Sequence, residues 1–267
     1  MRPAIDYFTY QFPEVPFFLA VLALQMIGAE VGFRVGRRLR ERSDETLRSQ
    51  VGVMEASVLG ILALLLGFAF SMAAARFDAR RQQILDEANA IGTTYLRTSL
   101  LPEPHKAKAA AALREYVDAR IEFYDAGTDL TRLRQAAQRA EKLHAELWDV
   151  ATTAGRDDPR AVTTGLFIAS LNSVIDMHAS RVAALQNRVP LGIFLMLYFV
   201  ATMAMGLAGY AAGTGGRRLP FPTVVAALMI TAVIVLIVDL HRPREGLIRV
   251  GQQSMLDLKE SLSRAGE

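Results

Sequence analysis

The residues with the clearest chemical potential are basic side chains that follow a long apolar segment. Arg76, Arg80 and Arg81 come directly after it. In a symmetric oligomer they would repeat as a ring of positive charge, and such rings concentrate anions at the mouth of a pore. The alternative is an ordinary contact with lipid headgroups, which basic residues beside membrane spans commonly make. Asp78 could pair with Arg81 three residues later and weaken the field.

Acidic residues follow one to two helical turns further on. Asp86 and Glu87, with Asp176 and His178 from a later helix, could supply ligands to a cation. Adjacent residues on a helix point in different directions, so at most one of the two neighbouring acids faces inward. We therefore expect a solvated acidic face that includes Asn89. His178 lies on an apolar stripe and is predicted to be a hydrogen-bonded packing residue rather than a ligand.

A single carboxylate, Glu30, lies in or at the edge of the first apolar segment. A carboxylate stranded in lipid is costly, so one that is retained there is by default a functional candidate. The alternative is that the segment ends near Ala29 and that Glu30 meets Arg34 or Arg37 at the membrane interface.

Enzyme chemistry finds no support in the sequence. We find no Walker loop, GxSxG or HExxH motif and no nucleophile–base pairing, and the chain has no cysteine. The 4 histidines are scattered. We predict no catalytic residue, metal or cofactor. The net charge of +3 comes from interleaved charges of both signs, which argues against a nucleic-acid partner.

The elements that must position these residues are helices, most of them apolar. Hydrophobic residues make up 52% of the 267 residues, and several uninterrupted apolar runs have the length that a helix needs to cross a bilayer. We predict an all-α protein with four transmembrane helices and a helical extramembrane domain between the second and third. The predicted parts are a first transmembrane pair in 1–75 (spans 17–33 and 56–75), the helical domain in 76–189, a second pair in 190–240 (spans 191–212 and 221–240), and an amphipathic tail in 241–267.

The second span is predicted to continue as one helix from Ala56 to about Leu101. Its extramembrane half carries an apolar stripe that includes Phe77, Ile84, Ala88, Ile91 and Tyr95.

Proline and glycine divide the rest of the helical domain. Pro102 and Pro104 end the long helix. A helix from about His105 to Ala126 buries Leu113, Tyr116, Val117 and the stem of Arg120, and stops at Gly127. Thr128 or Asp129 caps the next helix. From about Arg160 a second long helix runs back beside the first, and Pro190 kinks or restarts it; its apolar stripe comprises Val162, Leu166, Leu171, Val174, Ile175, Val182 and Leu185.

Small residues on the second span indicate a helix contact. Gly60 and Gly67, seven residues apart, are predicted to be helix-packing positions because small side chains let helices approach closely in a membrane.

The orientation of the chain in the membrane stays open. Counted over short loops, the arginines favour a cytoplasmic position for the loops between spans one and two and between spans three and four, which puts the helical domain outside. When the arginines are counted over all residues beside the membrane, the two sides have equal counts.

The run LGFAFSMAAARFDARRQQILDEANAIGTTYLRTSLLPEP, with the tail DLHRPREGLIRV, resembles the family of bacterial membrane proteins that carry a bestrophin-like domain. In the tail, His241 stands where an acidic residue is expected before Arg242. The family name points to bestrophins, which are pentameric anion channels with four spans and a cytosolic helical domain between the second and third. This resemblance implies a cytosolic helical domain, against the count over short loops.

Bestrophins narrow their pore with three apolar residues at successive i, i+4 positions of the second span. Leu62, Leu66 and Phe70 have that spacing and would form the constriction. Leu59, Ala63 and Gly67 fit equally well, and packing against neighbouring helices is the alternative for either set.

The resulting hypothesis is an oligomeric ion channel of the bacterial inner membrane, selective for anions, with the lipid bilayer and further copies of the chain as its partners. The alternative is a membrane-anchored scaffold or sensor whose helical domain binds a protein partner. An enzyme ranks third.

Overall fold

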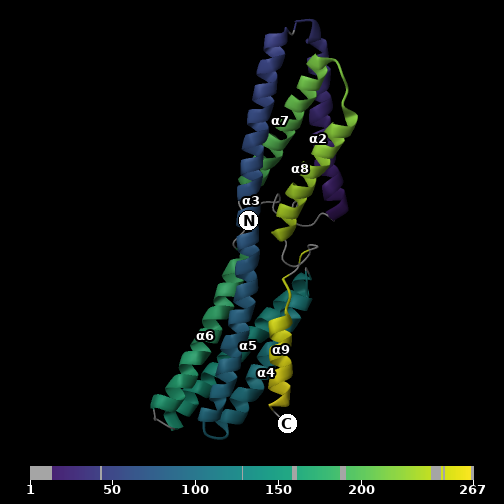
Figure 1. The fold of residues 1–267 in the computed structure, drawn as a ribbon. Coiled ribbons are helices and arrows are strands. Elements are labelled where there is room, and N and C mark those ends of the chain that lie inside the picture. The colour runs from purple at the N-terminus through teal and green to yellow at the C-terminus, as the bar shows by residue number, and fades with distance from the viewer. Residues whose placement is uncertain are drawn as a thin grey trace. The chain divides into compact units, whose positions relative to one another are not determined.

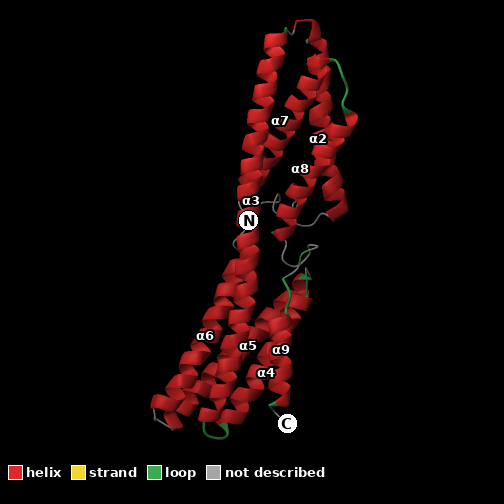
Figure 2. Cartoon of the chain, in the orientation of Figure 1, coloured by secondary structure: helices red, strands yellow, loops and turns green. Residues whose placement is uncertain are grey.

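The computed structural model describes residues 14–42, 44–127, 129–157, 161–186, 191–241, 248 and 250–265. In these residues every regular element is a helix and there is no strand (Figure 2). The prediction of an all-α chain is therefore confirmed. Of the described helices, 4 are long and apolar enough to cross a membrane. The chain is a multi-pass membrane protein.

The described residues divide into two compact units, and the division falls within the longest helix, between Arg76 and Phe77. We call the first the membrane unit. It contains α2 (Glu14–Arg38), the 3₁₀ turn η1 (Arg40–Arg42), α3 (Glu45–Arg97) as far as Arg76, α7 (Leu191–Gly215) and α8 (Pro220–Leu240) (Figure 1). The predicted border after Ala75 lies one residue before this division.

Each predicted span lies within one of these helices, but the helix of the second span begins earlier than expected. α3 starts at Glu45 instead of Ala56. Asp44 explains the earlier start, because its Oδ1 accepts a hydrogen bond from the backbone N–H of Leu47 at 2.8 Å. A side chain that caps the first turn in this way stabilises a helix start.

α2 and α7 contact each other so closely that their facing positions must be glycine. A Cβ added to Gly32 would lie 1.9 Å from the carbonyl oxygen of Gly206, and one added to Gly209 would lie 2.0 Å from that of Ala29. Backbone contact of this kind is typical of helices in membranes. Further glycines with a similarly close neighbour across this contact are Gly28, Gly36 and Gly213.

The second unit, called the helical unit below, contains the rest of α3 and the five remaining elements. They are α3 from Phe77, η2 (Thr98–Leu100), α4 (His105–Asp125), α5 (Leu130–Asp157), α6 (Ala161–Gln186) and α9 (Gln253–Arg264). All five α-helices bury side chains in one apolar core, among them Ile91, Leu113, Leu147, Phe167 and Met255. The amphipathic tail predicted after residue 240 is represented here by α9, which packs on α4.

The turns of the helical unit agree with the sequence. α3 gives way to η2 before Pro102, and α4 ends at Asp125, followed by Gly127 with a φ of 53°. That left-handed conformation favours glycine. Of the two predicted caps, Thr128 lies outside the described residues. Asp129 acts as a cap: its carboxylate accepts hydrogen bonds from the backbone N–H groups of Thr131 and Arg132 at 2.9 and 3.1 Å.

α6 runs back beside the second half of α3, as predicted. Arg97 of α3 donates a hydrogen bond to the carbonyl oxygen of Leu166, 2.8 Å away. The predicted stripe of α6 is wrong at its start, where Val162 and Leu166 are exposed and Phe167 is buried. α6 has apolar residues on more than one face. Because it packs against α5 and η2, the face that carries Phe167 is the buried one. The predicted kink at Pro190 lies outside the described residues.

Candidate functional site

The three residues predicted to form a pore constriction do not share one environment. Leu62 is 2% exposed and packs inside its own chain, Leu66 is half-buried, and Phe70 is 41% exposed. A residue that lines a pore between copies must be exposed in the single chain. Of the three, Phe70 meets that condition best and Leu62 does not meet it.

The alternative set with the same spacing lies on an open face of α3. Leu59 is 37% exposed, and Ala63 and Gly67 are exposed too. The two predicted packing positions are also open: an added Cβ at Gly60 or Gly67 would meet no atom within 4 Å. Within one chain these two glycines make no close helix contact, so their packing role stays a prediction for contacts with another copy.

The predicted basic ring lies where α3 passes from one unit to the other. Arg76 and Arg80 are half-buried, whereas Arg81 is exposed. The described residues contain no ion pair between Asp78 and Arg81, so this local pairing does not weaken the positive charge.

Glu30 is half-buried and has two arginine partners. Its Oε1 lies 2.8 Å from Nε of Arg34, one turn later on α2, and 3.3 Å from Nη2 of Arg218. The guanidinium of Arg218 also lies 4.6 Å from the ring centre of Phe33, a cation–π distance. Glu30 is therefore a paired carboxylate, held by one of the two arginines named in the interfacial alternative.

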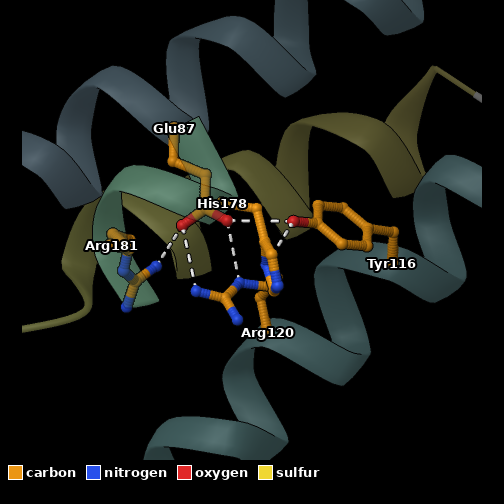
Figure 3. A network of polar contacts seen from close by, with 5 residues as sticks. All are labelled: Glu87, Tyr116, Arg120, His178 and Arg181. Carbon is orange, nitrogen blue, oxygen red and sulfur yellow. Dashed lines mark hydrogen bonds and ion pairs between the residues drawn. The ribbon is translucent and has the colours of Figure 1, made fainter. Parts of the chain in front are cut away.

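Glu87, which the sequence placed on a solvated face, is fully buried in the helical unit (Figure 3). Its carboxylate contacts two guanidinium groups. Arg120 of α4 brings Nε to 2.8 Å from Oε1 and Nη2 to 3.4 Å from Oε2, and Arg181 of α6 donates to Oε2. One carboxylate thereby links three helices that are distant in the sequence.

Aromatic and imidazole side chains extend this network. The hydroxyl of Tyr116 donates to Glu87 Oε1 at 3.0 Å and lies 3.2 Å from Nδ1 of His178 (Figure 3). His144 of α5 stacks against Tyr116 with ring centres 4.7 Å apart and meets His178 edge-on at 4.9 Å. His178 is thus the hydrogen-bonded packing residue that the apolar stripe predicted. We call these six residues the Glu87 network: Glu87, Tyr116, Arg120, His144, His178 and Arg181.

Burial and the two guanidinium groups set the protonation states of the Glu87 network. Burial alone raises the pKa of Glu87, but Arg120 and then Arg181 outweigh it, so the pKa lies below the usual value. Burial, followed by the charge of Arg120, lowers the pKa of His178 to about 4. Burial, followed by the charge of His178, lowers the pKa of His144 to about 4. At neutral pH the network holds one carboxylate, two guanidinium groups and two uncharged imidazoles.

The cation site considered for this region does not form. Asp86 is exposed and accepts a hydrogen bond from Gln82 at 2.8 Å, and Asp176 is exposed as well. Among the described residues, no three His, Asp or Glu side chains are grouped so that they could hold a metal ion.

Sequence reasoning missed Glu87 because a helix pattern does not show which distant residues meet. Its partners lie 33 and 94 positions away. One signal was available: Glu87 lies between Ile84, Ala88 and Ile91 on the buried stripe of α3. The glycine contact of α2 was also missed, although Gly28, Gly32 and Gly36 repeat every four residues in the sequence.

Comparison with known proteins points to one family. The sequence model of the Bestrophin-like domain family matches residues 19–255. No protein with a curated description matches the chain.

Solved structures of similar fold cover nearly the whole chain. A crystal structure of a bacterial Bestrophin homolog from Klebsiella pneumoniae matches with a TM-score of 0.67 and 17% identity, covering 94% of this chain and 97% of that chain. A variant of that homolog matches with a TM-score of 0.68 and 15% identity, covering 97% and 100%. At this identity the likeness establishes the fold. With a family match over most of its length and this shared fold, the chain belongs to the Bestrophin-like domain family.

Proposed function

We propose that copies of this protein assemble into an anion channel in the bacterial inner membrane, with the second span, in α3, lining the pore. The observation that carries the proposal is the fold, which matches a bacterial Bestrophin homolog over 94% of this chain. The chain forms two spans, then a helical unit, then two further spans. The resemblance to bestrophins implies the same order.

The surface of α3 supports a contact between copies. Within the membrane unit this helix exposes an apolar face that includes Leu59, Ala63, Gly67 and Phe70. A face of this kind suits a narrow hydrophobic pore, because a ring of apolar side chains can gate by excluding water. Arg76, Arg80 and Arg81 follow this segment and would place positive charge at one end of it.

The proposal is tested by ion flux into liposomes that contain the purified protein. We expect a chloride flux well above that of empty vesicles and a reversal potential that favours chloride over potassium. Folding is checked on the same sample by circular dichroism. A folded protein that gives no flux above empty vesicles would overturn the proposal.

Two alanine substitutions separate the alternative pore faces. Leu59→Ala removes an exposed side chain and is expected to widen the constriction, raising the flux several-fold without loss of stability. Leu62→Ala creates a cavity inside the chain and is expected to cost about 2–5 kcal/mol of stability. If Leu62→Ala raises the flux and leaves stability unchanged, the pore is lined by the face of Leu62, Leu66 and Phe70 instead.

The size of the detergent-solubilised protein discriminates the channel from a scaffold or sensor. We expect four or more copies around a central opening. A monomer or dimer would favour the scaffold.

A further inference from the structure

The Glu87 network carries one positive charge more than its carboxylate neutralises. In the described part of the chain, Arg120 and Arg181 form ion pairs with Glu87 and with no other acid. Arg120 is 1% exposed and Arg181 is buried. His144 and His178 add no charge at neutral pH. A buried charge without an opposite charge is strongly unfavourable, so the excess calls for an anion.

Nε of Arg120 lies 2.8 Å from Glu87 Oε1 as an ion pair, but two other nitrogen atoms of the Glu87 network are buried and lack a partner among the described residues. They are Nη1 of Arg120 and Nε2 of His144. Glu87 faces the other two nitrogens of the Arg120 guanidinium, and the third points away from Glu87 (Figure 3). A buried donor left unpaired costs about 1–3 kcal/mol, and a charged one costs more.

The two unpartnered nitrogens belong to neighbouring side chains. The ring of Tyr116 contacts His144, and the hydroxyl of the same Tyr116 contacts the carboxylate that holds Arg120. The charge of Arg120 contributes to the lowered pKa of His144, as expected for groups that lie near each other. Phe123 places its ring centre 5.1 Å from the Arg120 guanidinium, but a ring face carries no negative charge to balance the excess.

We propose that Nη1 of Arg120 and Nε2 of His144 bind a small monovalent inorganic anion inside the helical unit. The guanidinium supplies charge and a donor, and the neutral imidazole supplies a second donor in the tautomer with a proton on Nε2. Both atoms have almost no contact with solvent. A halide such as chloride therefore suits the site better than a phosphate ester or an organic acid. The site is distinct from the proposed pore and does not depend on conduction.

The main competing occupant is a water molecule. A buried water satisfies unpaired donors and commonly fills such positions. Water leaves the excess charge in place, however, whereas a halide removes it. The two occupants therefore differ in whether stability depends on the concentration of a particular anion.

The test is thermal unfolding of the full-length protein in detergent at pH 7.5, followed by the fluorescence of Trp148. This is the single tryptophan of the chain, and it lies one turn after His144 on α5. Sodium chloride replaces sodium gluconate at constant ionic strength. We expect the unfolding temperature to rise by several degrees and to saturate, because an anion bound only by the folded state stabilises it by mass action. No rise specific to chloride would overturn the proposal and would indicate water.

Variants locate the effect. Arg181→Gln removes the excess charge and leaves the pair of Arg120 and Glu87, and His144→Phe removes the second donor. Each is expected to weaken the apparent chloride affinity at least tenfold. The matched control is Arg139→Gln, an exposed arginine that pairs with surface acids, and it should keep the wild-type response. Since chloride bound elsewhere would stabilise every variant equally, an unchanged response in both Arg181→Gln and His144→Phe would overturn the proposal. If one of the two fails to fold, the other decides.

Discussion

The membrane unit and the helical unit hold their helices together by opposite means. In the membrane unit, α2 and α7 meet through glycines, and the closest contact would leave 1.9 Å between a Cβ on Gly32 and a backbone oxygen. In the helical unit the facing positions carry large side chains, such as Tyr116, Phe167 and Leu171, around the paired charges of Glu87.

The difference follows from the solvent of each unit. Between helices in lipid there is little hydrophobic driving force, so close van der Waals contact of the backbones is the main source of attraction. In water, burial of apolar area drives association, and large side chains bury more of it. A core of that kind can hold charged groups only when they are paired.

Loss of the Glu87 carboxylate is expected to have the largest effect on stability. Glu87→Gln leaves the guanidinium groups of Arg120 and Arg181 buried without a counter-charge, and breaking a buried pair in this way costs about 3–5 kcal/mol. The measurement is chemical unfolding of the purified protein in detergent. The control is Glu122→Gln, which removes an exposed acid that pairs with Arg139 and should stay within about 0.5 kcal/mol of wild type. Equal stability of the two variants would show that the charges are not essential to this core.

A methyl group at the glycine contact is expected to have the second-largest effect. Gly32→Ala forces α2 and α7 apart, and overpacking of this kind typically costs about 1–3 kcal/mol. Gly52→Ala on α3 is the matched control, since no atom lies within 4 Å of the added Cβ and alanine favours a helix by about 1 kcal/mol over glycine. Thermal unfolding in the same detergent compares the two. If Gly32→Ala is as stable as Gly52→Ala, close backbone contact is not what holds the membrane unit together.

Acid is expected to weaken the helical unit by a smaller amount. His144 and His178 have a folded pKa of about 4, below the ordinary value of 6.5. Between pH 4 and pH 6.5 the unfolded chain binds more protons than the folded chain. The free energy of unfolding therefore falls as the pH falls from 6.5 towards 4. Burial is the main cause of both lowered pKa values; the charge of Arg120 lowers both further, and Glu87 only partly offsets these effects.

Unfolding temperatures measured at pH 7.5, 6 and 5 test the acid effect. We expect the midpoint to fall by a few degrees over this range in the wild type and to fall less in the double variant His144→Gln, His178→Gln. A wild-type midpoint that rises on acidification would contradict the protonation states assigned to the Glu87 network.

Much of the fold could be predicted from the sequence because its signals are local. Apolar length defined the spans in α2, α7 and α8, and Gly127 and Asp129 marked the turn between α4 and α5 as the structure has it. The start of α3 was missed because an apolar run gives the position of the membrane segment but not of the polar turns before it, which Asp44 caps.

The candidate sites were harder to predict because they depend on long-range contacts. The spacing made Leu62, Leu66 and Phe70 equally good candidates for the pore constriction. Their burial differs because it depends on which neighbouring helices cover that face of α3. Spacing also identified Asp86 and Glu87 as neighbours without indicating that one of them meets arginines from two other helices. An arginine buried at its stem was expected at Arg120, but its charged end is buried as well.

The connection of three distant helices through Glu87 also implies an order of assembly during synthesis. The ribosome produces Glu87 first, Arg120 33 residues later and Arg181 94 residues after Glu87. While the chain is being made, Glu87 and Arg120 can pair as an electrically neutral couple as soon as α4 has emerged. Arg181 arrives with α6, after α4 and α5 and before α7. The excess positive charge therefore enters the helical unit only with α6, after α4 and α5 and before α9, and the couple of Glu87 and Arg120 made earlier is balanced in charge.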